Sequence, residues 1–193
     1  MRDANPLTKA AFLDKDGTLM EDIPYNSDPT LFAFSPGVVE GLLLLANSGF
    51  RLVIISNQSG VARGLFDFSA LEPMGARLRE MFTTEGLELA GVYWCPHFPG
   101  AVHPQFGVAC GCRKPAPGML LAAAQELSLD THASWMIGDR DSDVQAAHKA
   151  GCHSAFLNNS VNQGIDSSPE IVGKTFLDLA QQIIRHPSGR FQL

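Results

Sequence analysis

Positive charge, cysteine and long apolar runs are all scarce in this sequence. Its 193 residues include 14 lysine and arginine residues against 20 aspartate and glutamate residues, so the formal net charge is -6. A chain with this balance has no general attraction to a phosphate backbone, and we expect no nucleic-acid partner. An anionic substrate can still bind, provided that local cations receive it.

Signals for export or membrane insertion are also missing. The longest apolar stretch, residues 38–46, is too short to cross a bilayer and is interrupted by Glu40 and Gly41. The first residues contain no apolar segment followed by a cleavage site, so we expect no secretory signal. These absences predict a cytoplasmic protein with no membrane partner.

Only four cysteines are present, and three of them fall between Cys95 and Cys112. In a reducing compartment such a cluster indicates metal binding rather than disulfide formation. The fourth, Cys152, follows a glycine that is expected to end a helix. We predict that Cys152 is a buried side chain of apolar character.

Strand and helix patterns alternate along the chain. Apolar runs predict strands at residues 10–13, 52–55, 92–94, 135–137 and 155–157. Helical patterns lie between and after them, at residues 36–46, 71–83, 119–127, 143–150 and 176–185. The alternation predicts an α/β fold with a doubly wound, mainly parallel, Rossmann-like sheet and helices on both faces.

The domain organisation is expected to be simple. With 45% hydrophobic and 18% charged residues and no internal repeat, the composition is that of one globular domain over residues 1–193. No insertion is long enough for a separate cap domain. The tail, residues 186–193, is expected to be loose.

Three helix starts can be placed from their residues. Ser35 is expected to cap the first helix, with Pro36 in its first turn. Pro73 places the start of the second helix near that residue. Thr175, with Asp178 three residues later, is expected to cap the last helix.

The first chemical motif is Asp14-Lys15-Asp16-Gly17-Thr18, directly after a predicted buried strand. Two carboxylates at this spacing can face one reaction centre, one as a nucleophile and the other as a general acid and base. Gly17 permits the sharp turn that follows. A solvated turn is the alternative, whereas a calcium-binding loop is excluded because its glycine would stand at the sixth position.

Two further motifs supply groups that suit a phosphoryl group. In Ser56-Asn57-Gln58-Ser59-Gly60, a hydroxyl and backbone N–H groups follow a strand and can cradle phosphate oxygens. The pair Arg113-Lys114 supplies the local positive charge that an acidic protein needs. The alternatives are a polar turn and a solvated surface pair.

The fourth motif, Gly138-Asp139-Arg140-Asp141-Ser142-Asp143, begins at the end of another predicted strand. Asp139 can complete an octahedral magnesium site with Asp14 and a backbone carbonyl near Asp16. Asp143 could orient that site from the following helix. The alternative is capping of the helix N-terminus, and Asp141 could serve only that purpose.

A zinc-binding loop is predicted over residues 95–112. Cys95 and His97 form one close pair and Cys110 and Cys112 the other, which makes a closed tetrahedral set for a structural zinc ion. His103 is a rival ligand inside the loop. The alternative is a group of unligated thiols.

The four phosphoryl-directed motifs, in this order, resemble the haloacid dehalogenase superfamily of phosphotransferases. Its pattern is DxDGT, a strand ending in serine or threonine, a lysine, and GDxxxD. The resemblance implies that Asp14 is the nucleophile and Asp16 the general acid and base. It also implies that Ser56 and Lys114 hold the phosphoryl group and that Asp139 binds magnesium.

The zinc-binding loop, placed just before Arg113-Lys114, is similar to that of the D-glycero-D-manno-heptose 1,7-bisphosphate phosphatases and the related histidinol-phosphate phosphatases. The match runs from about residue 11 to residue 157 and includes Ala62-Arg63-Gly64. By this resemblance, the substrate contacts are Asp22, Ile23, Pro24, Tyr25, Asn57, Gln58, Ser59, Arg113 and Arg140.

Three positions depart from the pattern more usual in this family. Lys15 stands where arginine is usual, Ser56 replaces threonine and keeps the hydroxyl, and Arg140 stands where lysine is common. Lysine cannot reproduce the fork of an arginine. These exchanges keep the chemistry and leave the identity of the sugar open.

The resulting hypothesis is a magnesium-dependent phosphatase that acts on a small sugar phosphate through an aspartyl-phosphate intermediate. A D-glycero-D-manno-heptose 1,7-bisphosphate 7-phosphatase is the leading candidate, and a phosphatase for histidinol phosphate or another small ester is the alternative. A phospho-accepting signalling domain would need neither Asp16 as an acid nor the zinc-binding loop. A catalytically silent zinc-stabilised module is disfavoured by the intact motifs. The resemblance favours a monomer.

Overall fold

The computed structural model describes residues 7–158 and 165–187 of the chain. Of the tail that the sequence predicts to be loose, residues 188–193 lie outside this described part. Within it, no helix has the length and apolar character needed to span a membrane.

A six-stranded sheet forms the centre of the molecule, and every neighbouring pair of strands is parallel. In space the strands follow the order β3-β2-β1-β4-β5-β6. Their bounds are β1 Ala10–Leu13, β2 Arg51–Asn57, β3 Leu89–Cys95, β4 Trp135–Gly138, β5 His153–Leu157 and β6 Ile171–Gly173. The five predicted strands are confirmed, and β6 is an additional short strand at the edge.

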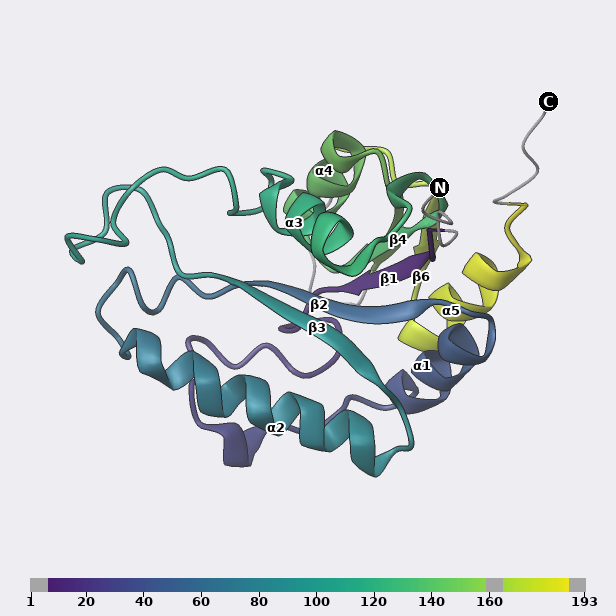
Figure 1. Cartoon of the computed structure of the whole chain (residues 1–193), viewed down its shortest axis with the longest axis horizontal. Helices are drawn as coiled ribbons and strands as arrows, with labels where there is room; N and C mark the ends of the chain where they lie inside the picture. The colour runs from purple at the N-terminus through teal and green to yellow at the C-terminus, as the bar shows by residue number, and fades with distance from the viewer. Residues whose placement is uncertain (1–6, 159–164, 188–193) are drawn as a thin grey trace, which may run out of the picture.

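Helices cover both faces of the sheet (Figure 1). The α-helices are α1 Val38–Asn47, α2 Leu71–Thr84, α3 Gly118–Leu127, α4 Asp141–Ala150 and α5 Phe176–Arg185. Short 3₁₀ turns occur at η1 Pro29–Leu31, η2 Phe68–Ala70 and η3 Thr131–Ala133. Figure 1 shows α3 and α4 on one face of the sheet and α1, α2 and α5 on the other. The predicted doubly wound fold is therefore confirmed.

Each face of the sheet has its own hydrophobic core, and β1 contributes to both. Ala11 and Leu13 pack into the core beneath α1, α2 and α5, whereas Ala10 and Phe12 pack into the core beneath α3 and α4. Side chains alternate between the two faces of a strand, so a strand covered on both sides must be apolar throughout. This explains why all four residues of β1 are apolar and fully buried.

Two of the predicted helix starts are wrong. Helix α1 begins at Val38 rather than at Pro36, because Gly37 adopts a left-handed conformation with φ of 79° and acts as the N-cap in place of Ser35. Helix α2 begins at Leu71, before Pro73. A proline in the first turn removes an N–H that has no intrahelical partner, so it does not delay the helix. The predicted cap of α5 is confirmed, since Thr175 accepts from Asp178 N at 3.1 Å.

The order of the strands creates a switch point between β1 and β4. From β1 the chain builds β2 and β3 on one side, then returns to place β4 on the other side of β1. Ligands of open α/β sheets bind beyond the carboxyl ends of the strands at such a point. Asp14 directly follows β1 and Asp139 directly follows β4, so both carboxylates lie where a ligand is expected.

Candidate active site

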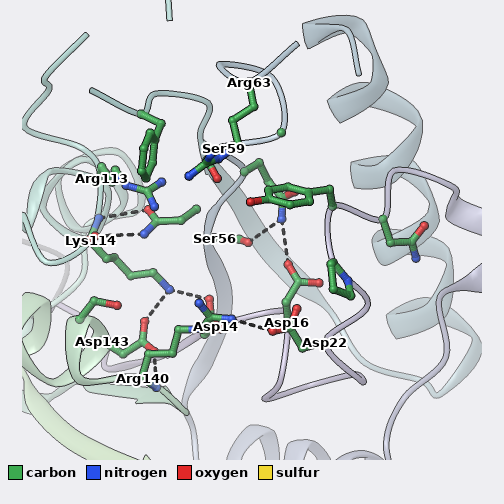
Figure 2. A pocket seen from close by; sticks show the side chains of 18 of the residues that line it. Asp14, Asp16, Asp22, Ser56, Ser59, Arg63, Arg113, Lys114, Arg140 and Asp143 are labelled. Atoms are coloured by element: carbon green, nitrogen blue, oxygen red, sulfur yellow. Dashed lines mark hydrogen bonds and ion pairs between the residues drawn. The ribbon is translucent and has the colours of Figure 1, made fainter. Parts of the chain in front are cut away.

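A pocket of about 580 Å³ opens at the carboxyl ends of the strands (Figure 2). The predicted catalytic and substrate-binding side chains all line it: Asp14, Asp16, Asp22, Ile23, Pro24, Tyr25, Ser56, Asn57, Gln58, Ser59, Arg113, Lys114 and Arg140. The sequence predicted no side-chain role for several other lining residues, namely Asn26, Gly60, Arg63, Phe98, Pro115 and Ser142.

Lys114 is the fully buried cation of the site. Its Nζ lies 2.5 Å from Asp14 Oδ1 and 2.6 Å from Asp143 Oδ1, and it donates to Ile55 O at 2.9 Å. Burial lowers the pKa of Lys114, but the two carboxylates outweigh burial and raise the pKa above its usual value. The ammonium group therefore stays charged beside the predicted nucleophile, where it can offset the charge of a phosphoryl group.

Three buried carboxylates meet beside Lys114. Ligand atoms of Asp14, Asp139 and Asp143 lie within 4.8 Å of one another. Burial and the neighbouring carboxylates raise the pKa of Asp139 to about 7 and that of Asp143 to about 6. One ammonium group does not balance three carboxylates, and hard oxygen donors in this number suit a magnesium ion. The donor set fits the predicted metal.

The structure refines the predicted magnesium ligands. The Asp16 side chain does not belong to the carboxylate cluster, whereas Asp143 does. Asp143 Oδ2 also accepts from Arg140 N at 3.0 Å and so caps α4. Asp141 lies outside the cluster, and its two oxygens accept from Ser167 N and Gln145 Nε2. Asp143, rather than Asp141, is thus the residue that could support a metal.

Asp16 is held from two sides at the pocket wall. Lys15 Nζ contacts its Oδ1, and Gln58 Nε2 donates to its Oδ2 at 3.0 Å. Burial raises the pKa of Asp16 above its usual value even though the Lys15 ammonium group opposes the shift. A carboxyl group with a raised pKa keeps its proton to a higher pH than an ordinary aspartate does, which favours a role as general acid.

Two glycines make room for the carboxylates. Gly17 has φ of +82°, and a Cβ placed on it would lie 2.3 Å from Asp139 Oδ2. A Cβ on Gly138 would lie 2.4 Å from Asp143 Cγ. Any side chain at either position would displace a carboxylate of the cluster, which gives both glycines a specific role in the motifs.

Side-chain amides position the predicted phosphate cradle. Asn57 Nδ2 donates to Lys114 O at 3.0 Å, and Lys114 N donates to Asn57 Oδ1 at 3.1 Å. Gln58 Nε2, which contacts Asp16, also donates to Ser56 Oγ at 3.0 Å. The amides of Asn57 and Gln58 therefore contact residues predicted to be catalytic, and both side chains also line the pocket.

Arginine side chains form the outer wall of the pocket. Arg140 Nη2 lies 2.6 Å from Asp22 Oδ2, and Arg113 Nη1 donates to His97 O at 3.2 Å. The guanidinium group of Arg63 lies 4.0 Å from the centre of the Phe98 ring and 5.7 Å from that of Tyr25. An acidic chain thus concentrates positive charge where an anionic substrate would enter.

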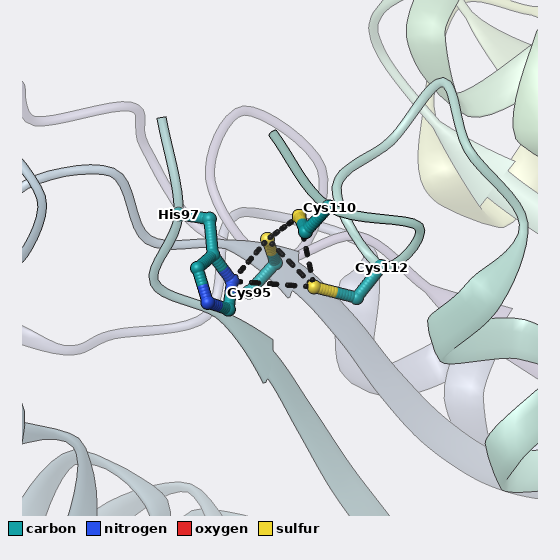
Figure 3. Close-up of side chains that lie close together, drawn as sticks. All are labelled: Cys95, His97, Cys110 and Cys112. Carbon is teal, nitrogen blue, oxygen red and sulfur yellow. Dashed lines mark hydrogen bonds between the residues drawn. The ribbon is translucent and has the colours of Figure 1, made fainter. Parts of the chain in front are cut away.

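The predicted zinc ligands come together at the base of the loop (Figure 3). Cys112 Sγ lies 3.2 Å from Cys95 Sγ and 3.1 Å from Cys110 Sγ, and the Nδ1 of His97 lies 3.4 Å from Cys112 Sγ. All the cysteines are free thiols. Three sulfurs and one imidazole nitrogen that face one another fit a tetrahedral zinc site.

His103 is not part of this group, so it is not a rival ligand. Its Nδ1 accepts from the backbone N–H groups of Gln105 and Phe106 at 3.2 and 3.3 Å. Cys152 is buried, as predicted, and does not belong to the zinc set.

Known proteins are similar to this chain in sequence and in fold. A family model described as HAD-hydrolase-like matches residues 111–179. The D-glycero-beta-D-manno-heptose-1,7-bisphosphate 7-phosphatase of Photorhabdus laumondii is 39% identical over 177 residues, which is 90% of this chain and 94% of the relative. The alpha-heptose counterpart from the same organism is 32% identical over 149 residues, covering 77% of this chain and 81% of the relative.

A solved structure extends the comparison. The D,D-heptose 1,7-bisphosphate phosphatase from B. bronchiseptica, complexed with magnesium and phosphate, superposes with a TM-score of 0.76 at 27% identity, covering 91% of this chain and 98% of that one. Sequence identity and coverage at these levels show that the chain is a phosphoric monoester hydrolase of the haloacid dehalogenase superfamily and belongs to its heptose-1,7-bisphosphate 7-phosphatase family.

Proposed function

We propose that this enzyme removes the 7-phosphate of D-glycero-beta-D-manno-heptose 1,7-bisphosphate in a magnesium-dependent reaction. The observation that carries the proposal is the contact of Asp14 with the buried Lys114 ammonium group, beside a carboxylate cluster and below a wall of arginines. The beta anomer is favoured because the relative named for it matches at 39% identity, against 32% for the relative named for the alpha anomer.

The first half of the reaction transfers the phosphoryl group to Asp14. A carboxylate oxygen of Asp14 attacks phosphorus, and the bond between phosphorus and the sugar oxygen breaks. Asp16 gives its proton to that leaving oxygen, while Lys114 and Ser56 contact the phosphoryl oxygens. Asp16 suits this role because burial raises its pKa.

The second half regenerates the enzyme. The Asp16 carboxylate takes a proton from a water molecule, whose oxygen attacks phosphorus. The bond between phosphorus and the Asp14 oxygen breaks, which releases inorganic phosphate and restores the Asp14 carboxylate. A magnesium ion held by Asp14, Asp139 and Asp143, with a backbone carbonyl near Asp16, would offset the negative charge of the phosphoryl group.

We assign a structural zinc ion to Cys95, His97, Cys110 and Cys112. Support comes from the sulfur and nitrogen atoms that face one another in the free-thiol cluster. A closed set with four protein ligands leaves no position for a substrate, so the metal would stabilise the loop rather than take part in the chemistry. The monomeric state, the single domain and the cytoplasmic location stay predictions.

Phosphate release from a panel of small esters tests the proposal. Both anomers of the heptose 1,7-bisphosphate and histidinol phosphate are compared, each with and without magnesium. We expect the highest kcat/KM for the beta-heptose bisphosphate and no turnover without magnesium. A higher kcat/KM for histidinol phosphate, or full activity without magnesium, would contradict the proposal.

A further inference from the structure

Arg63 is a pocket residue that the proposed mechanism does not use. It lies in the loop between β2 and η2 and lines the same cavity as Asp14. Its guanidinium carbon lies 4.0 Å from the centre of the Phe98 ring. Contacts of this kind hold the plane of an arginine in place and leave its N–H groups available at the edge of the plane.

The other cations of the pocket already have partners. Lys114 pairs with two carboxylates, Arg140 pairs with Asp22, and Arg113 donates to the backbone oxygen of His97. In the described part of the chain, by contrast, the Arg63 guanidinium group is within ion-pair distance of no carboxylate. A positive charge that lines a substrate pocket and has only aromatic neighbours is suited to an anion from outside the protein.

The surroundings of Arg63 strengthen this interpretation. Arg113 Cζ also lies over the Phe98 ring, 4.9 Å from its centre. Two guanidinium groups, those of Arg63 and Arg113, therefore meet at one aromatic ring inside the pocket. Like charges that crowd together repel one another, and an anion bound between them would relieve that repulsion.

The position of Arg63 indicates which part of a substrate it can reach. In Figure 2, Arg63 lies on the far side of the pocket from Asp14, across the open space. The phosphoryl group that is transferred must touch Asp14, so an anion at Arg63 belongs to another part of the substrate. We propose that Arg63 is a specificity-determining residue that binds the phosphate group of the bisphosphate which is not transferred. This inference rests on the proposed function.

The geometry also gives a reason for the aromatic neighbours. Guanidinium groups bind phosphate through two parallel N–H donors, and this bidentate contact needs a fixed orientation. Phe98 and Tyr25 fix that orientation before the substrate arrives, which reduces the entropy lost on binding. Lysine at this position would keep the charge and lose the fork.

The test compares two substrates that differ only in the second phosphate. Heptose 1,7-bisphosphate and heptose 7-phosphate carry the same scissile ester, and kcat/KM is measured for both with wild type, Arg63→Gln and Arg63→Lys. We expect the bisphosphate-to-monophosphate ratio of kcat/KM to fall about tenfold or more in Arg63→Gln, and by a smaller factor in Arg63→Lys. The ratio does not depend on the active fraction of a preparation, so partial misfolding does not obscure it.

Arg77→Gln is the matched control, because Arg77 pairs with Glu80 on the exposed side of α2 and does not line the pocket. It should leave the ratio unchanged. An unchanged ratio in Arg63→Gln would overturn the inference, whether kcat/KM falls for both substrates or for neither. Arg63 would then serve only to stabilise the loop that contains it. Wild-type enzyme that hydrolyses another ester but neither heptose substrate would instead contradict the proposed function.

Discussion

Gly17 and Gly138 explain, residue by residue, why the carboxylate cluster can form. Neither glycine has a Cβ, and a carboxylate occupies the space that a Cβ would take. The Asp139 carboxylate lies there beside Gly17, and the Asp143 carboxylate lies there beside Gly138. Gly17 also adopts a left-handed backbone conformation that other residues rarely accept. Both motifs therefore need glycine at these positions to leave room for the carboxylates, and Gly17 is also needed for its backbone conformation.

Replacing Gly17 with alanine should remove activity out of proportion to its effect on stability. The new Cβ would displace the Asp139 carboxylate, and we expect kcat to fall about 100-fold or more. Gly86→Ala is the matched control, since Gly86 has φ of +71° and no atom lies within 4 Å of the position that its Cβ would take. Both variants should lose about 1–2 kcal/mol of stability from backbone strain. Near-normal kcat in Gly17→Ala would contradict the role assigned to Asp139.

Asp143 gives a second prediction at this scale. Because Asp143 lies in the carboxylate cluster, Asp143→Asn should raise the magnesium concentration needed for half-maximal phosphate release by about 10- to 100-fold. Asp141→Asn is the matched control, as Asp141 occupies the same turn of α4 but lies outside the cluster. Equal magnesium midpoints for the two variants would argue against a metal at this position.

Single residues also mark the limit of what the sequence predicts. Asp14, Lys114 and Asp139 could be predicted to share one site because each belongs to a motif with a chemical reason for its residues, and the structure brings the three side chains together. Arg63 could not, since an arginine in a loop resembles any surface arginine until the Phe98 ring is placed beside it. The amide of Asn57 was predicted to contact substrate, but its engagement with the Lys114 backbone depends on two loops meeting in space.

At the scale of elements, the loop over residues 95–112 connects the proposed zinc site to the pocket. Phe98 follows the proposed ligand His97, and Arg113 follows the proposed ligand Cys112. Both residues line the pocket, and Arg113 also donates to His97 O. The positions of these two side chains therefore depend on the geometry of the zinc set.

Loss of one zinc ligand should consequently affect substrate binding more than the chemical step. In Cys112→Ser we expect zinc content to fall below one ion per chain, KM for the bisphosphate to rise about tenfold, and kcat to change less. Zinc is measured by elemental analysis and the kinetics by phosphate release. Cys152→Ala, a change at the buried cysteine outside the set, should keep the zinc. A zinc-depleted protein with unchanged KM would contradict the link.

Some helices and strands could be predicted from the sequence, whereas others were missed or misplaced. The strands β1 and β2 and the helices α3 and α5 could be predicted from apolar or amphipathic runs. Such runs are expected because these elements bury side chains against a face of the sheet. The edge strand β6 was missed, since its three residues have only Ile171 and Gly173 buried and form no run. The start of α1 was misplaced because the left-handed Gly37 separates Ser35 from the helix, which no side-chain preference reveals.

At the scale of the whole molecule, the winding of the sheet determines where the site lies. After β3 the chain returns to add β4 on the other side of β1, and this brings Asp14 and Asp139 together from distant parts of the sequence. The location of the site was predictable because parallel strands share one carboxyl edge. The shape of the pocket was not, since it depends on how the loops after β1, β2 and β3 fold over that edge.

The crowding of carboxylates should make stability depend on pH. Asp139 and Asp143 have pKa values raised to about 7 and about 6 in the folded protein, against about 3.9 for an unfolded aspartate. Between about pH 4 and pH 7 the folded state therefore binds more protons than the unfolded state. Stability contributed by these groups is present at low pH and is lost as the pH rises through about 7.

Thermal unfolding of protein dialysed free of magnesium measures this effect. We expect Tm to be about 3 °C lower at pH 8 than at pH 6, and magnesium to restore it at pH 8. Asp139→Asn removes a titrating carboxylate and should show a smaller pH dependence. A Tm that rises from pH 6 to pH 8 equally in both proteins would show that the folded state does not raise the pKa values of these carboxylates.

The proposed chemistry depends above all on Asp14 carrying the phosphoryl group during turnover. The enzyme can be quenched while it hydrolyses the heptose bisphosphate, reduced with borohydride and analysed by mass spectrometry of its peptides. An aspartyl phosphate is reduced to homoserine, so we expect homoserine at position 14 only when substrate and magnesium are both present, and none in Asp14→Asn. Rapid phosphate release with an unmodified Asp14, or by the Asp14→Asn protein, would contradict this role.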